Sequence, residues 1–591
     1  MNKPGVAFGD YIFKDSRKRK DWNYDGENHS NRNYFLPVFA AFLFAVLVFR
    51  LFFLQVIQGY YYRYLSDSNR TKTVVTHAPR GIIFDRNGAP LVYNVPGFRE
   101  NVNGKTVLIP NDEALNLIAG GKNNLEIDSL RNYPYKDAFA HVLGYVGQIS
   151  QDELANPLHS DYSSGDIIGK SGIEQEYEPE LRGIDGKQLF EIDANGNLTR
   201  KLGQQDPISG QNITLTLDAK LQEAVFAAMS TVKKGAAIVS TPQGQILAMV
   251  SKPSFDPNLF TMGEGYKVAS GSAYQNVSEV LLDGQNQPLL NRSLGGVYPP
   301  GSTFKLVVAS AALKNNIIDE NWQVDDTGIL KVGDFSFANW YYTDYGGTDG
   351  QVNIIKGIKR SNDIFFYKLA EKVGVDKVSQ MAKLFGLGQK LGVDLEGEQA
   401  GVVPTEEWKL KNIGEQWYLG DTYHYGIGQG YLLTTPLQVN AWTQAIANNG
   451  NLYRPHLLLS QPAQIINPNL LDSHSSDLIK EGMVEACSPG GVAWPLFNYE
   501  IKNANLPIDG KNILGVDPAS GSADMRHVVI ACKTGTAENG GDNTLAHAWI
   551  TLFAPAYKPQ VVVTVLSENS GEGSNIAGPI AKQILDNWFG K

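Results

Sequence analysis

The apolar run from Phe35 to Ile57 is the feature that most restricts what this chain can fold into. It reads FLPVFAAFLFAVLVFRLFFLQVI, and Arg50 is its single charged residue. A helix of this length spans roughly 34 Å, which exceeds the ~30 Å hydrocarbon core of a bilayer. Arg50 lies near one end, where a long side chain reaches the headgroups. The run therefore predicts a transmembrane helix over residues 35–57 rather than a helix buried in a soluble core.

The two flanks of this run differ in charge. Basic residues crowd the segment before it, whereas the first residues after it are poorer in Lys and Arg. Cytoplasmic flanks of membrane helices carry the excess of Lys and Arg. The run is also too long for a signal peptide, and no small-x-small cleavage site follows it. We therefore expect residues 1–34 to be a cytoplasmic tail, residues 35–57 to be a single-pass anchor in the inner (plasma) membrane, and the remainder to be periplasmic or extracellular. The basic residues before the run are Lys3, Lys14, Arg17, Lys18, Arg19, Lys20 and Arg32.

Composition excludes several classes of function. The chain has 591 residues and a formal net charge of −10, which argues against nucleic acid as the main partner. It has 2 cysteines, Cys487 and Cys532, so a disulfide framework and a cysteine-rich metal site are both excluded. Whether these two cysteines form a single bridge is left open. Cys532 precedes Lys533 on a predicted strand, so the two side chains should lie on opposite faces, with Cys532 in the core.

The region after the anchor divides into two parts that differ in their predicted secondary structure. Residues 58–209 combine short strands around an Asn87–Gly88 turn with a polar helix near 171–183, and they hold no cluster of reactive groups. We expect this part to be a non-catalytic pedestal domain. Residues 210–591 begin with a strand at 212–218, a helix at 219–234 and a hairpin at 235–251, and three further strands lie at 527–535, 547–556 and 560–568.

These strands lie at the two ends of the second region, with a helical stretch at about 300–450 between them. The hairpin and the three C-terminal strands would form one sheet of five strands, and the helical stretch would pack on its face. A final helix at about 576–588 closes the region. The prediction is an α+β domain whose long insert carries the sequence GSTFK.

Within that insert, Ser302 and Lys305 are three residues apart at the start of an apolar helix. The ordinary interpretation is an N-capping serine followed by a solvated lysine. The alternative is a nucleophile with its base, because residues i and i+3 share one face of a helix. Spacing alone does not decide, since Ser230 and Lys233 repeat it at a predicted helix end where we expect surface residues.

Two further motifs follow in a fixed order. Ser361 and Asp363 come just before an aromatic-rich helix, and the sequence Lys533-Thr534-Gly535 lies on a predicted strand. The order Ser-x-x-Lys, Ser-x-[Asn/Asp] and Lys-Thr-Gly, on helix, loop and strand, is typical of serine acyl-transfer enzymes that react with β-lactams. Together the three motifs favour chemistry at Ser302 over a helix cap.

The chain resembles the class B penicillin-binding proteins, which are monofunctional peptidoglycan transpeptidases, and is most similar to their elongation-type members. The resemblance rests on segments such as NRSLGGVYPPGSTFK, GKSGIEQEYEPELRG, VDLEGEQAGVVP and GIGQGYLLTTPLQ, and it covers nearly everything after the tail. It implies a transpeptidase domain over 210–591 with a five-stranded antiparallel sheet, on an elongated dimerisation-like pedestal over 58–209. It also implies peptidoglycan stem peptides and β-lactams as ligands, and a SEDS-type glycosyltransferase and other elongation-complex membrane proteins as partners.

The resemblance assigns a role to each residue of the first two motifs. Ser302 would attack the bond between the terminal D-alanines of a stem peptide, and Lys305 would be its base. Burial and the nearby Lys533 charge would lower the pKa of Lys305. Ser361 would relay a proton toward the leaving amine, and Asp363 would hold the motif in place. Many relatives have Asn at the last position, so the charge state of Asp363 is open.

The third motif would bind the substrate. Lys533 supplies positive charge, and the hydroxyls of Thr534 and Thr536 would bind the terminal carboxylate. Gly535 would let the substrate backbone lie close to the strand. The backbone N–H groups of Ser302 and Thr536 would form the oxyanion hole.

Several alternatives and absences complete the expectations. A D,D-carboxypeptidase or β-lactamase would pass the acyl group to water instead, and an anchored β-lactam sensor would not turn over. No cofactor is expected, and no zinc site, because no His or Cys lies between Lys305 and Ser361. His424 and the glycines near it are expected to be structural. The sequence does not determine the third residue of the stem peptide. It also does not determine whether the enzyme acts in elongation or in division.

Overall fold

A computed structural model describes most of the chain. The described residues are 34–102, 105–122, 124–193, 195, 197–263, 265–503, 525–538, 540 and 544–590, so the predicted cytoplasmic tail lies almost wholly outside them. The chain forms two compact units: Met1–Val74 with Gln188–Gln204, and Val75–Lys187 with Gln205–Lys591. This division differs from the predicted boundaries, because part of the predicted pedestal belongs to the first unit.

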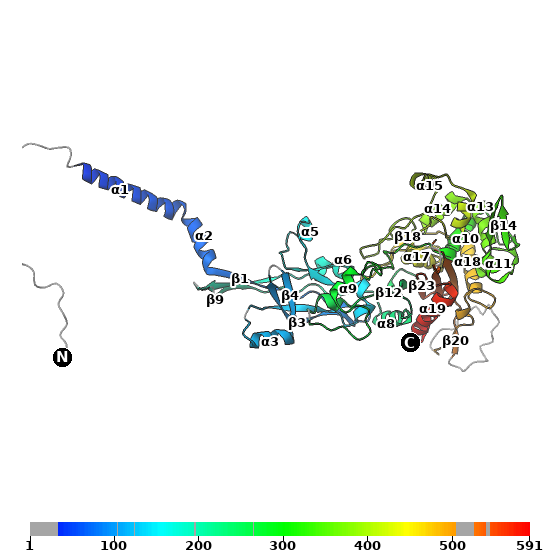
Figure 1. Ribbon diagram of the computed structural model, residues 1–591, viewed down its shortest axis with the longest axis horizontal. Coiled ribbons are helices and arrows are strands. Elements are labelled where there is room, and N and C mark those ends of the chain that lie inside the picture. Colours follow the sequence, from blue (N-terminus) through cyan, green and yellow to red (C-terminus); the bar gives the residue numbers. More distant parts are fainter. Residues whose placement is uncertain are drawn as a thin grey trace, which may run out of the picture. The chain divides into compact units, whose positions relative to one another are not determined.

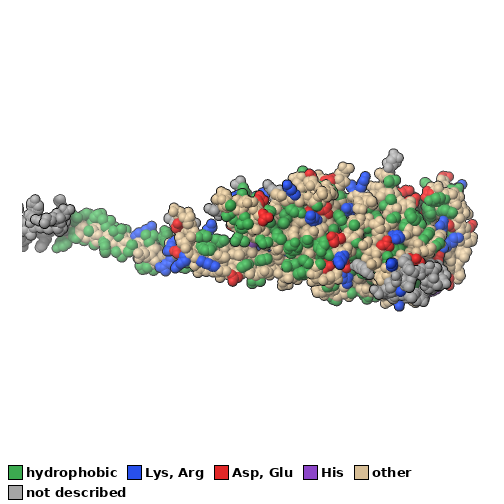
Figure 2. Space-filling view, turned by 90° about the horizontal axis from the view of Figure 1, so that it is seen from below, with side chains coloured by type: hydrophobic (Ala, Val, Ile, Leu, Met, Phe, Trp, Pro, Cys, Tyr) green, Lys and Arg blue, Asp and Glu red, His purple; other side chains and the backbone are tan. Residues whose placement is uncertain are grey.

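The first unit contains the predicted membrane helix. Helix α1 (Phe35–Phe52) continues through a π-helical turn (Phe53–Ile57) and is followed by α2 (Gly59–Arg70). The span 35–57 has none of its side chains buried, and its length and composition are those of a membrane-crossing helix. Figure 2 shows it as a continuous hydrophobic surface. A three-stranded sheet in the order β1-β8-β9 follows, from β1 (Thr71–Thr76), β8 (Gly186–Ile192) and β9 (Leu198–Gln205).

The second unit begins with a five-stranded sheet that belongs to the predicted pedestal. It consists of β2 (Ile83–Phe84), β3 (Pro90–Val102), β4 (Lys105–Pro110), β5 (Glu126–Asn132) and β10 (Ile213–Thr214). The Asn87–Gly88 turn between β2 and β3 is confirmed, and Gly88 has a φ of 85° that favours glycine. The strand predicted at 212–218 is shorter than expected and pairs in parallel with β2, so it joins the pedestal sheet.

The polar helix predicted near 171–183 is two short helices. These are α6 (Gly172–Glu176) and α7 (Glu178–Leu181), separated at Tyr177. The prediction of one helix was wrong because Pro179 has no N–H to donate to the carbonyl four residues earlier. Glu174 in α6 is fully buried and accepts hydrogen bonds from Arg80 and Arg131 at 2.8 and 2.6 Å. Burial alone would raise the pKa of Glu174, but the two guanidinium groups outweigh burial and hold that pKa below its usual value.

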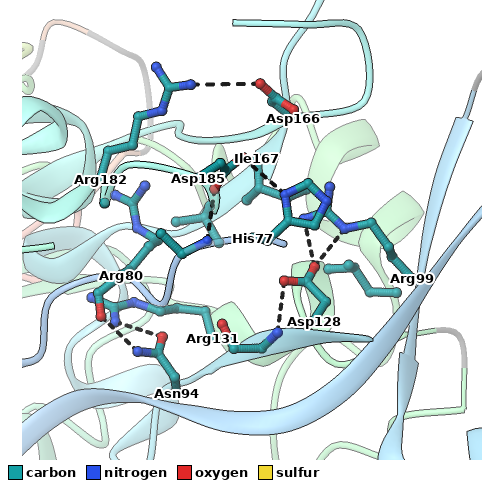
Figure 3. A pocket seen from close by; sticks show the side chains of 15 residues that line it. His77, Arg80, Asn94, Arg99, Asp128, Arg131, Asp166, Ile167, Arg182 and Asp185 are labelled. Carbon is teal, nitrogen blue, oxygen red and sulfur yellow. Dashed lines mark hydrogen bonds and ion pairs between the residues drawn. The ribbon is translucent and has the colours of Figure 1, made fainter. Parts of the chain in front are cut away.

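A cavity of about 70 Å³ lies beside these ion pairs. Figure 3 shows that several of its charged lining groups face a partner of opposite charge, such as Arg182 and Asp166. Arg99 binds Asp128 at 2.6 Å and His77 binds Asp185 at 3.1 Å. Because these charges are matched within the pedestal, we assign the cavity a structural role.

The sheet of the predicted second domain has five strands in the order β12-β11-β23-β22-β21, all antiparallel. Figure 1 labels two of them, β12 and β23. The strands are β11 (Gly235–Ser240), β12 (Ile246–Lys252), β21 (Ala531–Ala537), β22 (His547–Ala554) and β23 (Val561–Ser567). Strand β23 lies between β11 and β22, so the two ends of the region complete one sheet, as predicted. The hairpin predicted at 235–251 is confirmed as β11–β12.

Helices cover both faces of this sheet. Val239 on β11 points into the core shared with α8 (Ala219–Ala228) and α19 (Gly573–Phe589). Its neighbour Ile238 points into the opposite core, which contains Trp442 of α17 (Pro436–Ala447). This alternation is what a strand buried on both faces requires. The other helices of the insert are α10 (Lys305–Lys314), α11 (Trp340–Tyr345), α12 (Ile354–Lys359), α13 (Asp363–Val373), α14 (Val375–Leu384), α15 (Glu406–Ile413), α16 (Leu419–Gly426) and, after α17, α18 (Ser473–Ala486).

Candidate active site

Ser302 lies in a short 3₁₀ turn (Gly301–Phe304) that leads into α10. Gly301 has a φ of 54°, and a Cβ there would lie 2.8 Å from the Thr536 carbonyl oxygen. The turn is therefore pressed against β21, and only glycine fits at its first residue. The residue before α10 is Phe304, which has no side-chain cap, so the interpretation of Ser302 as an N-cap is wrong. Ser302 instead lines a cleft of about 880 Å³.

Lys305 is fully buried, which excludes a solvated lysine. Its Nζ donates to the Asp363 carboxylate at 2.6 Å, to the Ser361 carbonyl at 2.6 Å and to Ser361 Oγ at 3.3 Å. These are its hydrogen-bond partners among the described residues, and Ser302 Oγ is not one of them. Catalytic hydrogen bonds are often long or poorly aligned before substrate binds.

Two opposing effects act on the Lys305 ammonium. Burial lowers its pKa, because taking a charge out of water disfavours the protonated form, and the Asp363 carboxylate raises it. The pKa of Lys305 is lowered overall. A lysine in this position loses its proton more readily than an exposed one.

Ser361 is held in an uncommon backbone conformation at the start of α13. It has a φ of 53°, and Asn362 accepts a hydrogen bond from the Phe365 N–H at 2.9 Å as the cap of the helix. Asp363 accepts a second bond from the Trp340 N–H at 2.9 Å. The turn therefore places the Ser361 hydroxyl and the Asp363 carboxylate on the same side as Lys305.

Lys533 completes the cluster from the other side. It is fully buried on β21, and its Nζ donates to Ser361 Oγ at 2.8 Å. Burial, followed by the nearby Lys305 charge, lowers the pKa of Lys533 well below its usual value. Two ammonium groups this close repel each other, which disfavours protonation of both. Ser361 Oγ thus lies between two buried ammonium groups, one from each flanking motif.

The remaining residues of the third motif also lie at the cleft. Thr534, Gly535 and Thr536 line it on β21, together with Ser302. A Cβ at Gly535 would lie 3.0 Å from both the Pro300 carbonyl oxygen and Thr303 Cγ2. Glycine at this position therefore lets the strand pack against the turn that carries Ser302. This packing role differs from the expected one, which was to let a substrate backbone lie close to the strand.

The cleft contains residues that sequence patterns did not single out. Its described lining residues include four carboxylates and no Lys or Arg side chain. His424 also lines it, with its ring packed edge-on against Phe337, so this residue is closer to the site than expected. The neighbouring Gly428 is structural, as expected, because its carbonyl accepts the Gly301 N–H at 2.9 Å. The lining carboxylates are Asp344, Asp363, Glu538 and Glu572.

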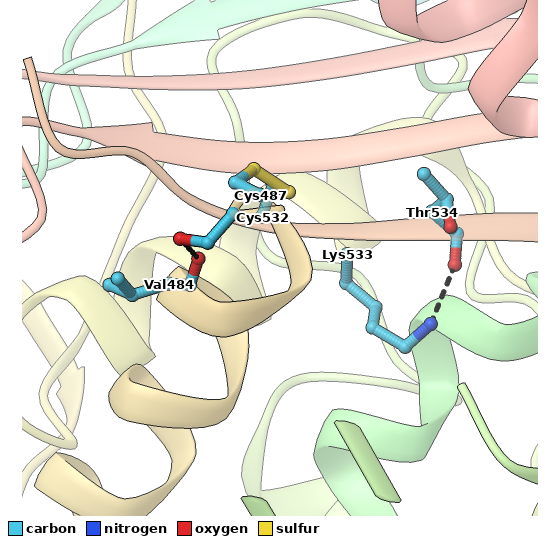
Figure 4. Close-up of a disulfide and its surroundings, with 6 residues drawn as sticks. Val484, Cys487, Cys532, Lys533 and Thr534 are labelled. Carbon is cyan, nitrogen blue, oxygen red and sulfur yellow. Dashed lines mark hydrogen bonds between the residues drawn. A yellow bond between two sulfur atoms is a disulfide. The ribbon is translucent and has the colours of Figure 1, made fainter. Parts of the chain in front are cut away.

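Cys487 and Cys532 form a disulfide, which the sequence left open. Figure 4 shows that Cys532 and Lys533 point to opposite sides of β21, as the alternation of a strand predicts. Both cysteines are buried in the core on the far side of the strand from the cleft. In the described part of the chain, no three His, Cys, Asp or Glu side chains are grouped as metal ligands are.

Comparison with known proteins matches two family models. Residues 235–586 match the penicillin binding protein transpeptidase domain, and residues 122–215 match the penicillin-binding protein dimerisation domain. The peptidoglycan D,D-transpeptidase MrdA of Salmonella typhimurium is 33% identical, over 92% of this chain and 94% of that protein. The chain therefore aligns with this relative over almost the whole length of both proteins.

Solved structures have the same fold. The complex between PBP2 and MreC from Helicobacter pylori matches with a TM-score of 0.71 at 28% identity, over 88% of this chain and 98% of that one. A structure described as the structural coordination of polymerization and crosslinking by a peptidoglycan synthase complex matches with a TM-score of 0.69 at 26% identity, over 95% of this chain and 98% of that one. The α+β architecture predicted from the sequence is confirmed.

Proposed function

The chain belongs to the penicillin-binding protein transpeptidase family and is a serine-type peptidoglycan D,D-transpeptidase, and from this premise we propose how its residues carry out the reaction. The observation that carries the proposal is the position of Ser361 Oγ, 2.8 Å from Lys533 Nζ and 3.3 Å from Lys305 Nζ. This hydroxyl joins the three motifs in one buried network at the cleft that contains Ser302.

Acylation begins at Ser302. Its Oγ attacks the carbonyl of the penultimate D-alanine, while the neutral form of Lys305 accepts the hydroxyl proton. The bond to the terminal D-alanine nitrogen breaks, and that nitrogen receives a proton through Ser361. The N–H groups of Ser302 and Thr536 stabilise the oxyanion, and Thr534 and Thr536 hold the terminal carboxylate.

The second half-reaction transfers the acyl group to an amine. The acceptor approaches as an ammonium group and must lose a proton before it attacks the ester at Ser302. The four carboxylates among the described lining residues attract that cation, and no described lining Lys or Arg repels it. This supports transfer of the acyl group to an amine. A carboxypeptidase or β-lactamase would instead transfer it to water.

A crosslinking assay tests the assignment. With uncrosslinked glycan strands that carry pentapeptide stems, the full-length protein in detergent should release D-alanine and form crosslinked stem dimers in equal amounts. D-alanine release without dimers would identify a carboxypeptidase. Binding of a penicillin without either product would identify the sensor that the sequence left as an alternative.

We also propose that the body after α1 lies outside the cytoplasm, with the anchor in the inner (plasma) membrane. The Lys and Arg residues that precede the span support this orientation. The disulfide between Cys487 and Cys532 supports it independently, because such bonds persist in oxidising compartments.

A reporter enzyme that works only outside the cytoplasm, fused after Lys591, should be active in intact cells. The same reporter fused to a chain lacking residues 1–57 should be inactive. Activity of a cytoplasmic reporter at the first position would overturn the orientation.

For partners, we propose a membrane glycosyltransferase of the SEDS type and other elongation-complex proteins. The relatives with solved structures support this, since one is complexed with MreC and another belongs to a peptidoglycan synthase complex. We propose that such a partner carries out the polymerisation. On the same grounds we propose that the enzyme serves elongation.

A further inference from the structure

The disulfide Cys487–Cys532 lies directly behind the catalytic cluster. The two Cα atoms are 5.9 Å apart, and Cys532 immediately precedes Lys533 on β21. Both sulfurs are buried, with 0% of Cys532 and 5% of Cys487 exposed. These are the only 2 cysteines of the chain, so its thiol chemistry resides in this one bond.

The helix at one end of the bond also contacts the segment that precedes the second motif. Cys487 follows α18, and a Cβ at Gly482 of that helix would lie 2.8 Å from Cβ of Ile358, so α18 packs tightly on α12. Glu485 binds Lys359 at 2.6 Å, and the Gly490 carbonyl accepts a hydrogen bond from Arg360 at 3.1 Å. The C-terminal end of α18 and the residues after it therefore bind the segment that leads directly into Ser361.

The strand at the other end of the bond is an edge strand. Among the residues that the structure describes, β21 pairs with β22 alone in the five-stranded sheet, and its other edge has no strand neighbour there. Lys533 must nevertheless hold its ammonium group 2.8 Å from Ser361 Oγ. The disulfide is the one covalent link that fixes this strand to the helix bearing on Ser361.

We propose that the Cys487–Cys532 disulfide is a positioning element for Lys533, and that acylation of Ser302 therefore depends on the redox state of this bond. The inference rests on the proposed acyl-transfer function. Closure of the bond removes two protons and two electrons from the two thiols, which pass to the disulfide of a thiol–disulfide oxidoreductase. Reduction by a dithiol returns both and removes the covalent link between β21 and the end of α18. Acylation of Ser302 would thus be slow in a reducing compartment, where the bond is open, and fast after oxidation closes it.

Rapid-mixing measurements with a fluorescent penicillin test the proposal. They give two quantities for the full-length protein in detergent: the rate constant of labelling and the fraction of molecules labelled. In Cys487→Ala/Cys532→Ala the rate constant should fall about 10- to 100-fold, the loss expected for a catalytic group displaced by about 1 Å, while the labelled fraction stays close to that of the wild type. A bond that only stabilises the fold would lower the labelled fraction and leave the rate constant unchanged.

Reversible reduction of the wild-type protein provides the second measurement, which does not depend on the folding of a variant. Phosphine reduction, followed by mass spectrometry to count free thiols, should slow labelling, and reoxidation should restore it. The double-alanine protein is the matched control and should not respond to the reductant. An unchanged rate constant in protein with both thiols free would overturn the inference. Absence of labelling in the oxidised wild type would instead contradict the proposed function.

Discussion

Ser302→Ala is expected to abolish covalent labelling by a fluorescent penicillin. The β-lactam carbonyl mimics the scissile amide, but its leaving group stays tethered, so the acyl-enzyme persists and can be seen on a gel. Without the Ser302 hydroxyl no ester forms. The fold should remain intact, because Ser302 caps no helix and the change in the free energy of unfolding should be within about 0.5 kcal/mol. Peptide mapping of the labelled wild type should place the adduct on Ser302.

The chain supplies a matched control for this experiment. Ser230 and Lys233 have the same spacing, and both are exposed just beyond α8, as the sequence predicted. Ser230→Ala should therefore label like the wild type. Label that survives in Ser302→Ala, or that maps to Ser230, would contradict the assignment. Rapid loss of label from the wild type would favour a β-lactamase.

Removal of Lys305 has the second-largest expected effect. Lys305→Ala should slow acylation by more than the roughly 10²–10⁴-fold attributed to a single general base, because nucleophile and base act as a unit. The variant also leaves the Asp363 carboxylate without its 2.6 Å partner, which should cost about 3 kcal/mol or more of stability. Lys305→Ala/Asp363→Asn removes both charges and separates the two effects. The double variant should regain stability while acylation stays slow, and recovery of fast acylation would exclude Lys305 as the base.

The pH dependence of acylation provides an independent check on the same base. Acylation should rise with pH as Lys305 loses its proton. Asp363 raises the pKa of Lys305, so Asp363→Asn should lower that pKa further and shift the ascending limb of the pH–rate profile to lower pH. A shift to higher pH would mean that another group controls the rate.

The sequence carried enough information to predict the sheet and the members of the active site. Strands β11 and β23 are apolar on both faces, so they had to be central strands of a sheet covered by helices. The Ser230–Lys233 pair has the same spacing as Ser302–Lys305, and it was the expected surface position at a helix end that argued against chemistry there. The structure brings Ser302, Lys305, Ser361, Asp363 and Lys533 to one cleft or directly behind it.

The contacts among these residues could not be predicted, because they depend on backbone turns that spacing does not encode. Helical spacing suggested that Lys305 faces Ser302, but Ser302 lies in a 3₁₀ turn and Lys305 is bound to Asp363. The φ of 53° at Ser361, which turns its hydroxyl between two lysines, leaves no trace in composition. The pairing of Cys487 with Cys532 likewise depends on where α18 ends relative to β21, a long-range contact.

The strand order of the five-stranded sheet has a consequence for how the chain folds during synthesis. Synthesis delivers β11 and β12 first and β21, β22 and β23 last, yet β23 must insert between β11 and β22. Until β23 pairs, the free edge of β11 can pair with non-native strands. Ser302 is already present at that stage, but Lys533 is not yet in place. Chain order thus separates the synthesis of the nucleophile from that of the strand that completes its cluster. A chain that ends before β21 lacks Lys533 and should not be acylated by a β-lactam, and its unpaired β11 edge favours non-native strand pairing.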